Sequence, residues 1–117
     1  MKRRLLSLTL VASLTACAAT PPVKFPDSAY EPLPSSYKEI VTSYLNHTLF
    51  DPYSAHISWS IIGPFKSSAI VEGKNVPAWS VPFDVNAKNR LGAYVGERHG
   101  YALIYHHQVV YILGLDI

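Results

Sequence analysis

The chain has 117 residues, of which 10 are lysine or arginine, 8 are aspartate or glutamate and one is cysteine. This length suits one small domain, and a single cysteine excludes a disulfide within the chain. The formal net charge of +2 comes from the start of the chain: Lys2, Arg3 and Arg4 take three of the ten basic residues and leave seven against eight acidic ones. The remainder lacks the basic surface that nucleic acid binding requires, and we expect no nucleic acid partner.

The first 16 residues have the pattern of a signal peptide. A basic start at residues 1–4 is followed by apolar and hydroxyl side chains at residues 5–14 and then by small residues. This order is typical of secretion, and the apolar run is about half of the ~20 residues that a membrane-spanning helix needs. A buried N-terminal helix is the alternative, but the segment has neither caps nor a polar face. We predict that residues 1–16 are cleaved from the mature protein.

The only cysteine ends the sequence Leu14-Thr15-Ala16-Cys17, which resembles the lipobox of bacterial lipoproteins. The resemblance implies that Cys17 carries diacylglycerol, that signal peptidase II cuts before it, and that the new amino group is acylated, typically with palmitate. Two or more acyl chains hold a protein stably on a membrane. Because Ala18 rather than aspartate follows the cysteine, the resemblance implies the outer membrane, with the protein facing the periplasm. We expect no cofactor beyond these covalent lipids; an ordinary signal peptide with a stray cysteine is the alternative.

Residues 17–36 are predicted to form the lipid anchor and a proline-rich tether. Five of the nine prolines of the chain lie in this segment: Pro21, Pro22, Pro26, Pro32 and Pro34. Such a composition favours extended polyproline II and would lift a domain off the bilayer. A disordered linker and a docking arm for a partner protein are alternatives.

Residues 37–117 are predicted to form one small α+β domain that begins with an amphipathic helix over residues 37–49. Ser36 and Glu39 match a capping box, and Asp51-Pro52 ends the helix. The apolar side chains at helical spacing are Tyr37, Ile40, Val41, Tyr44 and Leu45. This stripe needs a partner surface, and only strands follow in the sequence.

After the helix the period changes to two, which predicts strands. The expected strands are residues 55–61, 65–71, 79–86, 101–105 and 109–113, with turns at residues 72–75 and 106–108. Pro82 lacks an N–H donor, so we expect its strand to lie at an edge or to carry a bulge. The predicted fold is one helix packed on a four- to five-stranded antiparallel sheet, and a small Greek-key barrel is the alternative.

A turn rich in basic and asparagine residues follows the strand at residues 79–86, and it is the candidate binding loop. Its proposed contact residues are Lys88, Asn89, Arg90, Arg98 and His99. Together they would form a basic patch for a carboxylate, a phosphate or the acidic stems of peptidoglycan. The alternative is a solvated hairpin in which asparagine side chains bond the turn backbone.

Three short motifs resemble a small domain of uncharacterised proteobacterial proteins, some of them lipoproteins. They are Asp-Pro-x-Ser-Ala at residues 51–55, Val-Asn-Ala-Lys-Asn at 85–89 and Gly-x-Tyr-x-Gly at 92–96. The resemblance covers about half of the mature chain and implies no activity. Arg90 and Leu91 depart from the small or aromatic pair expected there.

Metal binding and catalysis have little support in the sequence. His106 and His107 are adjacent, so on a strand they would point to opposite faces, and no spacing among the five histidines suits zinc. We found none of the common nucleophile or metalloprotease motifs. We therefore predict no metal site and no enzyme.

The sequence favours a lipid-anchored, non-catalytic interaction module in an assembly of the bacterial envelope. The partners would be the membrane, through the lipid, and an envelope protein whose identity the sequence does not give. Two alternatives stay open: a lipoprotein that binds cell-wall ligands or inhibits a wall enzyme, and an accessory lipoprotein of a secretion or conjugation channel.

Overall fold

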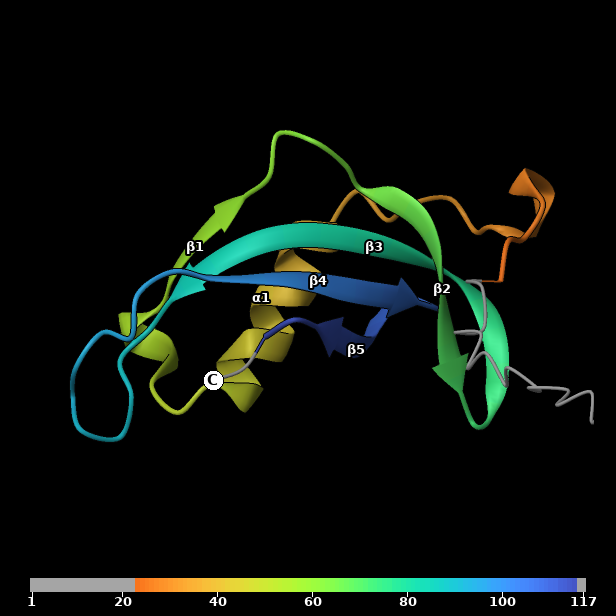
Figure 1. The fold of residues 1–117 in the computed structure, drawn as a ribbon. Coiled ribbons are helices and arrows are strands. Elements are labelled where there is room, and N and C mark those ends of the chain that lie inside the picture. The colour runs from red at the N-terminus through yellow and green to blue at the C-terminus, as the bar shows by residue number, and fades with distance from the viewer. Residues whose placement is uncertain (1–22, 116–117) are drawn as a thin grey trace, which may run out of the picture.

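The computed structural model describes residues 23–115; the predicted signal peptide, Cys17 and the segment to residue 22 lie outside the described residues. Within them the elements follow in the order η1 (Asp27–Ala29), α1 (Tyr37–Thr48), η2 (Pro52–Ser54), β1 (His56–Trp59), β2 (Phe65–Val71), β3 (Lys74–Asn86), β4 (Arg98–Tyr105) and β5 (Gln108–Leu113). The strands form one antiparallel sheet that arches over α1 (Figure 1). The α+β prediction is confirmed.

Strand β3 organises the sheet because it is long enough to pair with two strands along one side. Strand β2 pairs with its first half and β1 with its last four residues, while β4 pairs along the other side and β5 adds to β4. Within residues 23–115, β5 pairs only with β4 and β1 pairs only with β3, so the sheet is open. The Greek-key barrel alternative is therefore wrong.

Pro82 lies in the interior of this central strand, so the expectation of an edge or a bulge is wrong. It pairs with Tyr101 of β4, and its carbonyl accepts a hydrogen bond from the Ser60 N–H at 3.3 Å on the other side. The nitrogen and carbonyl of one strand residue point to the same side. The missing N–H of Pro82 therefore faces Ser60, just past the end of β1, so the donor that proline lacks is missing only at the end of the β1–β3 ladder.

The main core lies between α1 and one face of the sheet. Val41 and Leu45 of α1 are fully buried against alternate residues of β3 and β4, and these strand residues are Val81, Phe83, Val85, Ala102 and Ile104. Gly100 of β4 lies under the Phe83 ring, where a Cβ would come within 3.0 Å of the ring. The helical stripe thus buries the face that the sequence pattern predicted.

The N-terminus of α1 differs from the prediction, because the Ser36 side chain makes no capping hydrogen bond. Ser36 has a ψ of 23°, whereas a capping side chain needs extended backbone to reach the first-turn amides. A turn from Pro34 to Tyr37, closed by a 3.1 Å backbone hydrogen bond, imposes this angle. The capping-box prediction is therefore wrong, although the helix does begin at Tyr37.

Several strand boundaries also differ from the predicted ones. Strand β3 begins at Lys74 and β4 at Arg98, so both are longer than predicted, while β1 ends at Trp59. Ile61, the last residue of the predicted strand 55–61, lies outside β1 and is fully exposed. The β2–β3 and β4–β5 turns are tight pairs with positive φ, at Glu72-Gly73 and His106-His107.

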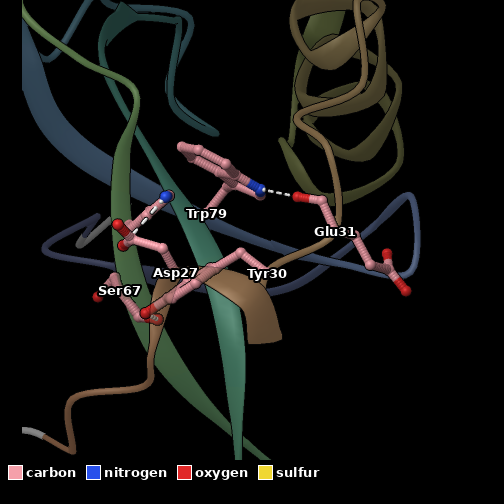
Figure 2. A network of polar contacts seen from close by, with 6 residues as sticks. Asp27, Tyr30, Glu31, Ser67 and Trp79 are labelled. Carbon is pink, nitrogen blue, oxygen red and sulfur yellow. Dashed lines mark hydrogen bonds and ion pairs between the residues drawn. The ribbon is translucent and has the colours of Figure 1, made fainter.

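Residues 23–36, which we name the N-terminal strap, contact the sheet. The indole N–H of Trp79 donates to the carbonyl of Glu31 at 2.8 Å, and the Tyr30 hydroxyl donates to the carbonyl of Ser67 at 2.7 Å (Figure 2). The Tyr30 ring packs edge-on to the Trp79 indole, with centroids 5.9 Å apart.

Two ion pairs add to these contacts, one between Lys66 and Asp27 at 3.1 Å and one between His106 and Glu31. Proline-rich backbone has no internal hydrogen bonds, so its carbonyls can accept from side chains such as the Trp79 indole. Over residues 23–36 the predicted tether therefore lies against the sheet.

Candidate functional site

The motif segments that lie far apart in the sequence meet at one end of the sheet. One segment, residues 50–56, connects α1 to β1; the other, residues 86–96, begins the connection from β3 to β4. We name these two segments together the two-loop site. The β3–β4 connection projects beyond the end of the sheet in Figure 1, at the far left of the view.

Ser54 joins the two segments. Its hydroxyl accepts a hydrogen bond from the Lys88 backbone N–H at 2.9 Å and donates to the Asp51 carbonyl at 2.9 Å. The Asp51 carboxylate in turn accepts from the Ser54 N–H at 3.3 Å, and the Tyr94 hydroxyl donates to the Ser54 carbonyl at 3.2 Å. The Asp-Pro-x-Ser motif therefore forms a short 3-10 turn whose serine holds the opposite loop.

The loop after β3 is also fixed by its own hydrogen bonds. The side-chain oxygen of Asn89 accepts from the backbone N–H groups of Leu91 at 2.9 Å and Ala93 at 3.2 Å. Gly92 has a φ of +78°, and Lys88 pairs with Tyr94 as an isolated bridge. The Asn89 side chain thus fixes the backbone of the loop, as the hairpin alternative proposed. The side chains of neighbouring residues form the outward surface.

The outward surface of the two-loop site is aromatic and aliphatic. Its exposed large side chains are Phe50 (63% exposed), Tyr53 (99%), Leu91 (90%) and Tyr94 (46%). The Arg90 guanidinium lies 5.5 Å from the centroid of the Phe50 ring, and the Lys88 ammonium lies 5.5 Å from that of Tyr94. Each cation therefore lies over an aromatic ring, and neither makes an ion pair with another residue in the range 23–115.

The other two predicted contact residues do not join this surface. Arg98 and His99 are consecutive in β4, so their side chains point to opposite faces of the sheet. His99 is paired with Asp84 across the ladder, at 2.7 Å between Nδ1 and Oδ1, and its ring is edge-on to Tyr101. The structure thus divides the five predicted residues, with only Lys88, Asn89 and Arg90 in the two-loop site.

The predicted contact residues did not include Tyr94, His56 or Asn86, which also lie in the two-loop site. Tyr94 contacts His56, with 3.3 Å between the hydroxyl and Nε2, and His56 lies directly across the ladder from Asn86. The side-chain oxygen of Asn86 is buried and has no hydrogen-bond partner within residues 23–115. Asn86 belongs to the Val-Asn-Ala-Lys-Asn motif, and this motif was the one feature of the sequence that pointed to Asn86. Only the pairing of β1 with β3 places His56 beside Asn86.

The described residues offer no metal cluster. Residues 23–115 contain no group of three or more His, Cys, Asp or Glu side chains placed to hold a metal ion. One shallow groove in this part of the chain runs between α1 and the β4–β5 turn, and its lining includes Glu39, Ser43, His47 and His107. No helix among the described residues is long and apolar enough to cross a bilayer.

Comparison with protein-family models, with curated proteins and with solved structures gave no match for this chain.

Proposed function

We propose that this chain is a lipid-anchored protein of the bacterial envelope, held through acyl chains on Cys17, and that its domain is a non-catalytic interaction module. In this proposal the protein sits on the outer membrane and faces the periplasm. The two-loop site contacts an envelope protein. The single observation that carries the proposal is the pairing of exposed aromatic rings with cations on two loops that are hydrogen-bonded to each other.

The composition of this surface suits a protein partner. Aromatic residues and arginine are enriched where proteins bind each other, and energetically important contacts often involve tyrosine and arginine. Tyr53 and Leu91 are nearly fully exposed, so they are available to a partner without rearrangement. Because Ser54 and Asn89 hold the loop backbones, binding loses little conformational entropy.

The position of the two-loop site also supports the proposal. The first described residues of the strap lie at the right of Figure 1, and the β3–β4 loop lies at the far left. A domain anchored through its N-terminus would thus present the two-loop site away from the membrane.

The proposal assigns no catalysis to this site. Ser54 is the hydroxyl nearest to the centre of the hydrogen-bond network, and it already donates to Asp51 and accepts from Lys88. It is not free to act as a nucleophile while it holds the loops. A second hydroxyl of this network, on Tyr94, is engaged with the Ser54 carbonyl.

A wall ligand remains the second candidate, and the exposed aromatic rings of the two-loop site favour it, because such rings can cover the apolar faces of sugars. The channel-accessory alternative requires the strap to contact a partner, but Tyr30 and Glu31 of the strap already contact the chain's own sheet.

Photocrosslinking in living cells tests these alternatives. A photoreactive residue replaces Arg90 in one strain and Ala29 of the strap in another, and adducts are identified by mass spectrometry. We expect a discrete protein adduct from Arg90 only. An adduct from Ala29 only would contradict the proposal and favour the channel reading, whereas glycan adducts from Arg90 would favour the wall ligand.

The lipid anchor is tested separately by labelling with radioactive palmitate. We expect label on the wild-type protein and none on Cys17→Ser, which should also leave the membrane fraction. Equal membrane association of the two proteins would contradict the anchor.

A further inference from the structure

The connection between β1 and β2 exposes the most prominent apolar side chains outside the two-loop site. We name residues 60–64 the apolar loop. Ile61 is 100% exposed and Ile62 is 65% exposed, and Phe65, which follows the loop at the start of β2, is also exposed. Neither isoleucine packs into the hydrophobic core on either face of the sheet.

The apolar loop has a defined shape. The Ser60 N–H donates to the carbonyl of Pro82 at 3.3 Å, and the Ser60 hydroxyl accepts from the Ile62 N–H at 3.1 Å. These bonds fix the base of the loop on the central strand. The β1–β2 connection, which contains the apolar loop, projects at the top of Figure 1, and the side chain of Ile61 is fully exposed.

The strap enters the structure beside the strand that follows this loop. Val23 and Lys24 line one surface hollow together with Ser67 and Ser68 of β2, and Val23 is itself exposed. The strand begins at Phe65, immediately after the apolar loop. The start of the described chain therefore lies beside the strand into which the apolar loop leads.

The length of chain before Val23 limits how far Val23 can lie from an anchored cysteine. Only residues 18–22 separate Cys17 from Val23. Even fully extended, six steps along the backbone span about 20 Å. If Cys17 is acylated, Val23 stays within about that distance of the bilayer surface, and Ser67 and Ser68 of β2 lie beside it.

We propose that the apolar loop is a second membrane contact, which inserts Ile61 and Ile62 into the interface of the same bilayer that holds the lipid on Cys17. This inference rests on the proposed lipid anchor. Two aliphatic side chains are too little apolar area for stable membrane binding alone. Beside an acyl anchor their local concentration at the bilayer is high, so a weak contact is sufficient. The second contact would fix the orientation of the domain and point the two-loop site away from the bilayer.

The test uses the full acylated chain, in which Cys17 is blocked by lipid and one new cysteine carries an environment-sensitive fluorophore. The label is placed at Ile61→Cys and, as a matched control, at Leu91→Cys in the two-loop site, which is also highly exposed. The proteins are reconstituted into vesicles of phosphatidylethanolamine and phosphatidylglycerol, with and without lipids that carry a quencher on the acyl chain. Flotation of the vesicles reports anchoring independently of the fluorophore.

We expect a blue shift and quenching at position 61 and neither at position 91. A label at 61 that stays water-like while the protein floats with the vesicles would overturn the loop contact and leave the anchor intact. A shift at 61 only in native envelope membranes, and not in pure lipid, would overturn it in favour of a protein partner. Failure of the protein to float would overturn the anchor and the loop contact together.

A second pair of chains tests the isoleucines themselves. The label is moved to Ser60→Cys, in the wild-type loop and in a chain that also carries Ile61→Ser and Ile62→Ser. We expect the blue shift in the first chain to be lost in the second, while flotation is unchanged. An equal shift in both chains would show that the isoleucines do not make the contact.

Discussion

Replacing Ser54 with alanine tests whether one hydroxyl holds the two segments of the two-loop site together. The substitution removes the acceptor of the Lys88 N–H and the donor to the Asp51 carbonyl, both at 2.9 Å in a part-buried position. A buried group that is left without a partner costs about 1–3 kcal/mol. Because Ser54 is only part-buried, water can replace some of the loss, so we expect the free energy of unfolding to fall by about 1–2 kcal/mol.

The assay is urea unfolding, followed by the fluorescence of Trp59 and Trp79, with amide hydrogen exchange of Lys88 as the local measurement. Ser58→Ala is the matched control, because Ser58 is exposed on β1 and its hydroxyl makes no hydrogen bond to another residue in the range 23–115. We expect the Lys88 amide to exchange faster in Ser54→Ala and unchanged in the control. A Ser54→Ala protein within about 0.5 kcal/mol of wild type, the range of ordinary surface changes, with unaltered Lys88 exchange, would refute the reasoning.

Three further predictions concern the fold that positions this site. Leu45→Ala, at a fully buried helix position, should lower the free energy of unfolding by about 2–5 kcal/mol, whereas Leu91→Ala, at an exposed position, should leave it nearly unchanged in the same urea titration. Gly100→Ala should cost about 1–3 kcal/mol, because its Cβ would meet a buried phenyl ring at 3.0 Å; an unchanged melting temperature would contradict this. Trp79→Phe removes the 2.8 Å hydrogen bond to Glu31, so limited proteolysis should cleave the strap faster than in wild type while the sheet stays intact.

The elements with a clear local period could be predicted from the sequence. The stripe that contains Val41 and Leu45 marked the buried face of α1, and alternation along residues 79–86 marked the inner face of β3. In both cases the spacing of apolar residues matches the geometry of the element, so no distant contact is needed to recognise it. The extension of β3 back to Lys74 was missed because its early residues alternate weakly and pair with β2.

The candidate site was predicted only in part. The motifs located both segments of the two-loop site. The predicted basic patch, however, grouped residues only because they are close to each other in the sequence. Arg98 and His99 point to opposite faces of the sheet, and Asp84 pairs with the histidine. The aromatic surface around Phe50 and Tyr53 did not stand out, because exposure is a property of the folded chain.

The sequence by itself determined the local features of this protein: one helix, mostly β structure after it, and an N-terminus that resembles a lipoprotein signal. Tertiary structure decided the rest through contacts between distant residues. Ser54 meets Lys88 across 34 positions of the chain, and Trp79 meets Glu31 across 48. These pairings depend on how β1, β2 and β4 align along β3, and no local period encodes that alignment. For the same reason the sequence predicts a strand edge at Pro82, yet this residue lies in the central strand, just past the end of its pairing with β1.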